Sequence, residues 1–163
     1  MDQTRPMATV RFKQTAVTSD QLLASHADEL VSDTLALSRI LTVADQVGVA
    51  QASLDISVDY TKERSQFDRT IASFQAIKHK AADMMLKVES ARSLLYYAAC
   101  TVDAWLAGEV DRAELHEAAC MASACASEAA FFNAGSGIQM HGGVGITEEY
   151  DIQLYFKLSL IHI

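Results

Sequence analysis

Residues that break helices are scarce in this sequence. Its 163 residues include one proline and seven glycines, and neither type occurs between Gly48 and Gly108. Five of the glycines are concentrated between positions 135 and 145. This distribution excludes collagen-like, disordered and small β proteins, and the long stretch without turn formers favours long helices. The length predicts one domain, too short for an enzyme that has a complete doubly wound nucleotide-binding domain and a second domain.

Cysteine is also scarce. Cys100, Cys120 and Cys125 are an odd number and contain no Cys-x-x-Cys pair, which excludes a disulfide framework. Their neighbours are apolar or small, so we expect buried thiols in a reducing compartment. The first five residues are not followed by the apolar segment of a signal peptide. These observations predict a cytoplasmic location.

Positive charge and long apolar runs are lacking as well. Thirteen basic and 21 acidic residues give a net charge of −8, and the sequence contains no basic run. Binding to nucleic acid or to an anionic membrane surface is therefore not expected. No apolar stretch reaches the roughly 18 to 20 residues that a membrane-spanning helix needs.

The first 25 residues differ from the rest of the chain. Met7 to Val17 alternates apolar and polar side chains, which predicts a short strand. A single strand is not stable alone, so it either packs on the helices or belongs to a sheet that this chain does not carry. Thr18, with Gln21 three residues later, is a capping-box start for a short helix. We assign residues 1–25 to a β-strand remnant and lead-in.

Four helices are predicted after this lead-in. Their expected ranges are Ser25 or Asp28 to Ser65, Ser73 to Leu106, Asp111 to Asn133, and Thr147 onward. Gly108 stands where a left-handed residue would end the second helix. Residues 26–163 are therefore expected to form an all-α, antiparallel four-helix bundle, preceded by the short N-terminal β segment.

Three of these helices carry distinct apolar patterns. The first has a stripe made of Leu37, Ile40, Leu41, Ala44, Val47, Leu54 and Val58. The second has a cleaner stripe made of Ile77, Ala81, Met84, Val88, Ala91, Leu95, Ala98 and Val102. The third is rich in alanine, which allows close helix–helix approach. A first helix of about 38 residues would be about 57 Å long, so we expect oligomerisation to cover its ends.

Common catalytic and metal-binding patterns are missing. None of the five histidines follows a Glu by three residues, as the di-iron sites of helical bundles require. No Gly-x-Ser-x-Gly nucleophile turn occurs. Gly135-Ser136-Gly137 begins like a dinucleotide-binding fingerprint, but Met140 stands in place of the third glycine and no strand precedes it. We predict no metal site and no catalytic residue of these types.

The glycine-rich segment from Gln139 to Thr147 is a first candidate binding site. Gly142, Gly143 and Gly145 allow a close backbone approach, and their N–H groups precede a predicted helix, an arrangement that suits a phosphate. The alternative is a connection whose backbone needs positive φ.

The segment from Arg64 to Phe67, followed by Gln75, is a second candidate. Arg64 could instead satisfy carbonyl groups at a helix end, and Phe67 could pack between two helices. These residues alone therefore predict a helical bundle with two possible anion-contacting loops.

Together these segments resemble the C-terminal domain of acyl-CoA dehydrogenases. The matching stretches are Val47-Gly48, Tyr60 to Phe67, Ser73 to Lys78, Ala82 to Met84, and Ile138 to Tyr150. Their order and spacing match over about residues 30 to 155, and the combination of Arg-x-Gln-Phe with Gln-x-x-Gly-Gly-x-Gly is specific. Residues 2–5 and 8–12 also resemble the last strands of the family's middle β-domain. We expect the chain to be about the final third of a longer protein.

The resemblance implies FAD-dependent α,β-dehydrogenation of acyl-CoA thioesters, a reaction of fatty acid metabolism. FAD lies between subunits in this family, so a homo-oligomer (dimer or tetramer) or a partner acyl-CoA dehydrogenase subunit is implied. By the resemblance, Arg64 contacts the pyrophosphate, Phe67 packs near the adenosine, and Gln75 is a further contact. The other implied cofactor residues are Gln139, Met140, His141, Gly142 and Gly143. Arg39 corresponds to a family arginine near the acyl-CoA site.

Departures from the family pattern leave the function open. Asp68 replaces the usual glycine, and its charge disfavours a nearby pyrophosphate. In one branch of the family the catalytic Glu precedes the arginine matched by Arg39, where this chain has Ser38. In the other branch it lies beyond the position of Ile163. We therefore expect a domain or short subunit that is inactive alone. The alternative is a non-catalytic helical oligomerisation module that has lost flavin binding.

Overall fold

The computed structural model describes residues 8–21 and 27–161 of the chain. Its helices are α1 (Ala27–Glu63), α2 (Gln75–Leu106), α3 (Arg112–His141) and α4 (Ile152–Ile161). Three short 3₁₀ helices are η1 (Ser19–Gln21), η2 (Ile71–Ser73) and η3 (Gly142–Ile146). Two strands of two residues each, β1 (Ser65–Gln66) and β2 (Arg69–Thr70), form a hairpin between α1 and α2.

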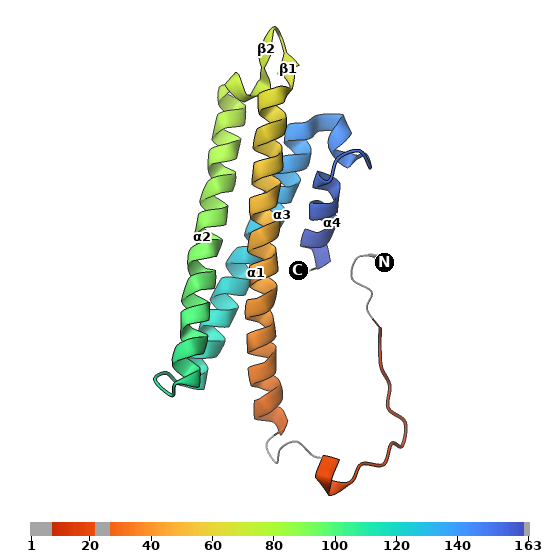
Figure 1. Cartoon of the computed structure of the whole chain (residues 1–163), viewed down its shortest axis with the longest axis vertical. Coiled ribbons are helices and arrows are strands. Elements are labelled where there is room, and N and C mark those ends of the chain that lie inside the picture. The colour runs from red at the N-terminus through yellow and green to blue at the C-terminus, as the bar shows by residue number, and fades with distance from the viewer. Residues whose placement is uncertain (1–7, 22–26, 162–163) are drawn as a thin grey trace.

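The helices form the predicted bundle. Helices α1, α2 and α3 are long and lie side by side, and the shorter α4 packs against α3 and α1 (Figure 1). The β1–β2 hairpin projects beyond one end of the bundle, and the α2–α3 connection closes the other end (Figure 1). This arrangement confirms the all-α four-helix fold.

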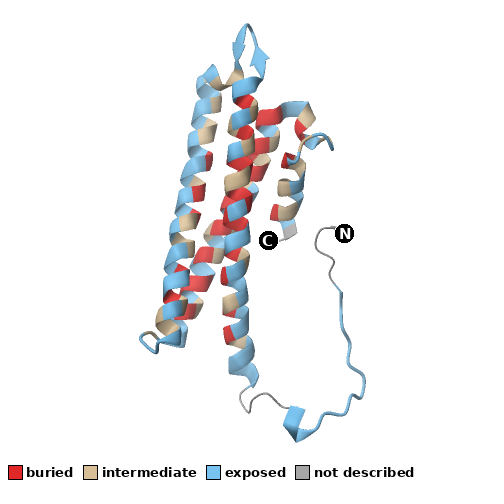
Figure 2. Ribbon diagram, in the orientation of Figure 1, coloured by how far each residue is buried: buried red, intermediate tan, exposed pale blue. Residues whose placement is uncertain are grey.

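The core is built from small and medium side chains between α1, α2 and α3 (Figure 2). Every member of the predicted α2 stripe is buried or half-buried, as its helical spacing indicates. The α3 contribution consists mainly of fully buried alanines: Ala118, Ala119, Ala122, Ala126, Ala129 and Ala130. Buried Asn133 joins the three helices, since its side-chain nitrogen donates to the carbonyls of Ala50 at 3.0 Å and Met84 at 3.1 Å.

The predicted apolar stripe of α1 is wrong at two positions. Leu41 is 72% exposed, and Ala44 is also exposed. The buried face passes through Ile40, Val43 and Val47 instead. Because successive helical residues differ by about 100° around the axis, Leu41 turns away from the core that Ile40 faces. Only the packing of α2 and α3 decides which of these residues is covered.

The predicted end of the second helix at Gly108 is confirmed. Gly108 has φ 76°, its N–H donates to the carbonyl of Trp105, and Glu109 N–H donates to that of Ala104. These two bonds are those of a Schellman C-cap. Asp111 caps α3 by accepting a 2.9 Å hydrogen bond from Glu114 N–H.

The third helix is longer than predicted, and Gly135 and Gly137 do not interrupt it. Both lie inside α3, which continues to His141 rather than ending at Asn133. A Cβ on Gly137 would lie 2.7 Å from Ser57 Oγ and 2.9 Å from Ile152 Cγ1. Gly137 is therefore a contact point where α1 and α4 approach α3, and it is not a turn residue.

The strand predicted from Met7 to Val17 is wrong over residues 8–17, which are exposed and contain no strand. Strands need backbone hydrogen-bond partners, and no segment in the described part of the chain pairs with these residues. The short helix after Thr18 is confirmed as η1, and Thr18 N–H donates to Gln21 Oε1 at 3.0 Å. Met7 and residues 22–26 of the proposed lead-in lie outside the described residues.

Candidate functional site

The Arg64–Phe67 segment forms the hairpin at the end of α1. Ser65 pairs with Thr70 and Gln66 with Arg69, so Phe67 and Asp68 are the two turn residues. Their φ values are 55° and 60°. A two-residue hairpin turn of this kind requires positive φ at both positions, which Asp tolerates better than most residues. The geometry explains why a glycine suits the position that Asp68 occupies.

The side chains of this hairpin are open to solvent. Phe67 is 86% exposed. Among the described residues, its ring contacts that of Phe74, edge-on, with the ring centroids 6.3 Å apart. It projects from the bundle and does not pack between two helices. Arg64 is also exposed, and no described acidic side chain forms an ion pair with its guanidinium. Both side chains are therefore available to a ligand.

Gln75 lies close to this hairpin in the fold. It is the first residue of α2, exposed, and its side-chain nitrogen lies 2.9 Å from His79 Nε2. The hairpin, the short η2 helix and the start of α2 all lie at one end of the bundle (Figure 1). Gln75 and Arg64 thus share that end.

The glycine-rich segment divides into buried and exposed residues. Met140 and His141 are only 5% and 4% exposed, whereas Gln139, Gly142 and Gly143 are exposed. Gly142 has φ 68°, and nothing lies within 4 Å of the place where a Cβ on either glycine would stand. A ligand can therefore reach the backbone here, while Met140 and His141 can act only from within the protein.

The expectation that a helix begins directly after these glycines is wrong. Gly142 to Ile146 forms η3, and α4 begins at Ile152 rather than at Thr147. The positive φ of Gly142 also confirms the alternative, a connection whose backbone needs such a conformation. That requirement and a close ligand approach are compatible in one residue.

A ring contact joins the two candidate segments. Tyr60, in the last turns of α1, stacks on His141 with ring centroids 4.2 Å apart and an interplanar angle of 21°. Its hydroxyl donates to the carbonyl of His141 at 3.4 Å. No role was predicted for Tyr60. The only signal of a link to the candidate site was its place four residues, or one helical turn, before Arg64.

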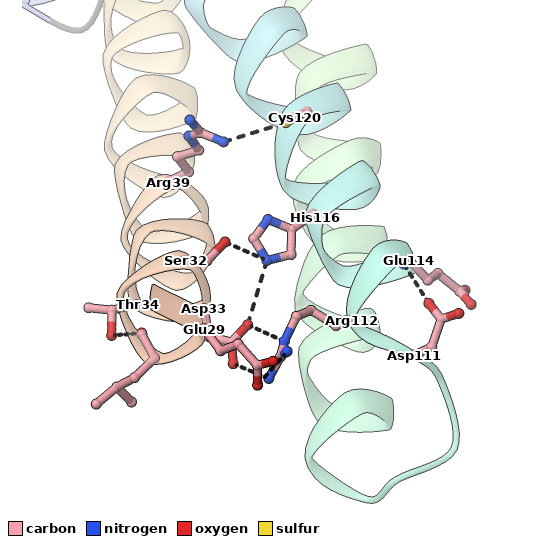
Figure 3. Close-up of polar contacts among 11 residues, drawn as sticks. Glu29, Ser32, Asp33, Thr34, Arg39, Asp111, Arg112, Glu114, His116 and Cys120 are labelled. Atoms are coloured by element: carbon pink, nitrogen blue, oxygen red, sulfur yellow. Dashed lines mark hydrogen bonds and ion pairs between the residues drawn. The ribbon is translucent and has the colours of Figure 1, made fainter. Parts of the chain in front are cut away.

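Arg39 lies in a different part of the molecule. Its exposed guanidinium donates to Cys120 Sγ at 3.5 Å (Figure 3). At about 1.5 Å per residue, Arg39 is about 37 Å from Arg64 along α1. The structure therefore separates the predicted substrate residue from the predicted cofactor residues of the same chain.

The expectation of buried thiols is wrong for two of the three cysteines. Cys100 and Cys120 are exposed and Cys125 is half-buried, and all three are free. Neighbours such as Ala98 and Ala119 are fully buried, but they point to a different side of the helix than Cys100 and Cys120, so the local composition misled the prediction. Burial raises the pKa of the Cys125 thiol, and the charge of Glu128 adds to this effect.

An ionic cluster pins the start of α3 to the first part of α1 (Figure 3). Arg112 contacts both carboxylate oxygens of Asp33, at 2.8 and 3.1 Å, and reaches Glu29 at 3.0 Å. The hydrogen bonds that Arg112 donates to Glu29 and Asp33 raise the pKa of its guanidinium. His116 Nε2 lies 3.6 Å from Asp33. Because one guanidinium on α3 bridges two carboxylates on α1, this cluster is a clamp between the two helices.

The described residues contain neither a metal-binding cluster nor a membrane-spanning helix. No group of three or more His, Cys, Asp or Glu side chains there is arranged to hold a metal ion. Within the same ranges, no helix has the length and apolar character needed to cross a bilayer.

The chain is similar to known proteins over most of its length. The family described as "Acyl-CoA dehydrogenase, C-terminal domain" matches residues 29–162. Acyl-CoA dehydrogenase IpdE2 of Mycolicibacterium smegmatis is 40% identical over 157 residues, which are 96% of this chain and 43% of that protein. This chain therefore spans less than half the length of that relative.

Solved structures show the same relationship. Butyryl-CoA dehydrogenase from Megasphaera elsdenii is 32% identical with a TM-score of 0.77, covering 84% of this chain and 34% of that one. A structure described as the Tcur3481-Tcur3483 steroid ACAD G363A variant is 33% identical with a TM-score of 0.72, covering 79% of this chain and 34% of that one.

Proposed function

The chain belongs to the acyl-CoA dehydrogenase family, as its C-terminal helical domain, and from this we propose that it holds part of an FAD molecule for an acyl-CoA dehydrogenase. The complete system is proposed to be an oxidoreductase that converts an acyl-CoA thioester to the α,β-enoyl-CoA. When bound, FAD supplies the acceptor for the hydride that leaves the β-carbon.

The exposed guanidinium of Arg64, which forms no ion pair with any described acidic side chain, is the observation that carries this proposal. A guanidinium fork matches the oxygens of a pyrophosphate, and charge-assisted hydrogen bonds of this kind are among the strong ones. Arg64 stands at the same end of the bundle as the open backbone of Gly142 and Gly143. Exposed Phe67 offers an aromatic face for the adenosine portion. These donors fit the ADP half of FAD.

The other predicted cofactor residues have more limited proposed roles. Exposed Gln75 and Gln139 offer side-chain amides to the ligand. Met140 and His141 are buried, so we propose that their backbone and packing, rather than their side-chain tips, serve the site.

The separation of Arg39 from Arg64 supports a shared site. A thioester held near Arg39 and a pyrophosphate held near Arg64 would lie about 37 Å apart along one helix. We propose that Arg39 serves acyl-CoA in one active site and that Arg64 serves FAD in another, which requires a neighbouring subunit. The neighbour is a second copy in a dimer or tetramer, or a partner acyl-CoA dehydrogenase subunit that carries the catalytic base absent at Ser38.

The proposed location is the cytoplasm. The three free thiols are compatible with a reducing compartment, and the acidic surface is compatible with the absence of nucleic-acid and membrane partners.

Calorimetric titration of the full chain with FAD, ADP and FMN tests the proposal. A site for the ADP half binds FAD and ADP but not FMN, which lacks the adenylate. Arg64→Ala should weaken FAD binding about tenfold or more, because a charge-assisted hydrogen bond contributes about 1.5–3 kcal/mol. Lys62→Ala is the matched control, since Lys62 is a nearby exposed cation already paired with Asp59 at 3.0 Å.

A non-catalytic oligomerisation module is the second candidate function. The observation that favours it is exposed Asp68 in the hairpin turn, whose negative charge opposes an anionic ligand. Flavin absorbance of the chain, purified alone and after co-expression with acyl-CoA dehydrogenase subunits, separates the two functions. Colourless protein in both preparations, together with no heat of FAD binding, supports the module.

A further inference from the structure

Three aromatic rings meet where α1, α3 and the segment before α4 converge. Tyr60 stacks on His141 at 4.2 Å, and Tyr150 lies edge-on to Tyr60 at 5.6 Å and to His141 at 5.5 Å. We call Tyr60, His141 and Tyr150 the ring cluster. His141 directly precedes the exposed glycines of η3, and Tyr60 lies one helical turn before Arg64.

The η3 backbone packs against His141, the residue that precedes it. His141 is 96% buried, and its Nδ1 donates to the carbonyl of Gly137 at 2.8 Å. The next residue, Gly142, turns the chain, and its N–H donates to the carbonyl of Ile138. Gly145 then returns so close that a Cβ there would stand 2.9 Å from His141 Cβ. Displacement of His141 would therefore displace the turn.

Tyr60 is the one member of the cluster that also contacts the Arg64 segment. Its carbonyl accepts a 2.9 Å hydrogen bond from Arg64 N–H, while its hydroxyl and ring hold His141. The backbone bond would form with any residue at this position, whereas the Tyr60 side chain ties the end of α1, from which the hairpin starts, to His141 and the η3 turn.

We propose that Tyr60 is a positioning residue for FAD, holding Arg64 and the Gly142–Gly143 backbone at the separation that one pyrophosphate requires. The inference rests on the proposed function and deepens it. Two segments held in place before binding lose little conformational freedom on binding, so their affinities for one ligand combine favourably. Without the Tyr60 ring each segment still folds, but the side-chain contact that ties the last turns of α1 to His141 is lost.

The test compares Tyr60→Leu and Tyr60→Phe with Tyr96→Leu, an exposed tyrosine on α2 that serves as a matched control. FAD affinity is measured by calorimetry in the wild-type preparation that binds FAD, alone or with the partner subunit. Hydrogen exchange of residues 142–146 is measured without ligand, and thermal unfolding monitors the fold. Tyr60→Leu should weaken FAD binding about tenfold and speed exchange of residues 142–146, because the stacked ring contact with His141 is lost.

The conservative variant separates positioning from mere stability. Tyr60→Phe keeps the ring stack and should restore FAD affinity to within about threefold of wild type, because only the long 3.4 Å hydrogen bond is lost. Tyr96→Leu should change neither affinity nor exchange in residues 142–146.

The outcomes distinguish this inference from the function on which it rests. If Arg64→Ala abolishes FAD binding but Tyr60→Leu binds FAD as the wild type does, the positioning role is wrong and the proposed function stands. If the wild-type chain binds no FAD in either preparation, the proposed function fails, and the role of Tyr60 toward FAD fails with it. If exchange of residues 142–146 is unchanged in Tyr60→Leu, the coupling itself is absent.

Discussion

At the scale of single residues, Gly137 shows how one missing side chain decides the packing of three helices. It lies inside α3, where an alanine would be the better helix former. The side chains of Ser57 on α1 and Ile152 on α4 occupy the space that a Cβ would need. Both are fully buried, so neither can move into solvent to relieve the contact.

We expect Gly137→Ala to lower the free energy of unfolding by about 1–3 kcal/mol, the usual cost of overpacking a core. Gly48→Ala is the matched control, because a Cβ at Gly48 in α1 would meet nothing within 4 Å. That variant should raise the stability by about 0.5–1 kcal/mol through the removal of chain entropy. Urea denaturation of both variants measures the difference. A shift in the same direction for both would contradict the packing role of Gly137.

At the scale of elements, the ends of the helices are set by short local signals. The Schellman C-cap at Gly108 and the N-cap at Asp111 enclose a connection of only five residues between α2 and α3. The ionic cluster of Arg112, Glu29 and Asp33 then fastens the first turn of α3 to α1. The start of α3 is therefore held by two separate sets of contacts, its own N-cap and the ion pairs with α1.

Asp111→Ala should lower the free energy of unfolding by about 1 kcal/mol, since it leaves the Glu114 N–H without its side-chain acceptor. Asp111→Asn keeps an acceptor oxygen and should retain most of the stability. Glu109→Ala is the control, an exposed acidic side chain two residues earlier that caps nothing. Thermal unfolding measures the stability of each variant. Equal losses of stability in Asp111→Ala and Glu109→Ala would show that charge, and not capping, matters.

At the scale of the whole molecule, the bundle leaves large apolar side chains in water. On α1 these include Leu30, Val31, Leu35 and Leu41, and on α2 they include Met85, Leu86, Tyr96 and Leu106. Leu30 and Leu41 lie about three helical turns apart on one face of α1. Exposed apolar faces of this kind mark surfaces that associate with another protein chain.

We therefore expect the wild-type chain to sediment as a dimer or larger assembly. The double substitution Leu30→Gln and Leu41→Gln should shift it toward the monomer, because both residues are exposed in the isolated chain and add association energy only at an interface. Lys78→Gln, a change at an exposed polar position, is the control. Sedimentation velocity over a range of protein concentrations measures the effect. A wild type that is monomeric throughout the range would contradict the proposed oligomer.

The residues of the candidate site could be proposed from the sequence, but their arrangement in space could not. The Arg64 segment and the glycines at 142 and 143 stand out in the sequence because exposed cations and glycines are recognisable locally. Their connection through Tyr60 and His141 was not predictable, since that contact joins residues 81 positions apart. The burial of His141 and the exposure of Leu41 depend in the same way on which helices pack around them.

The helical class, the second helix with its buried stripe, and the left-handed cap at Gly108 follow from the sequence alone. These features rest on hydrogen bonds and side-chain periodicity within a few residues, so they need no knowledge of the rest of the fold. The tertiary structure alone decided that Gly137 is a helix contact, that the N-terminal segment has no strand partner, and that one tyrosine joins both candidate cofactor segments. Each of these depends on contacts between distant parts of the chain, which local patterns do not record.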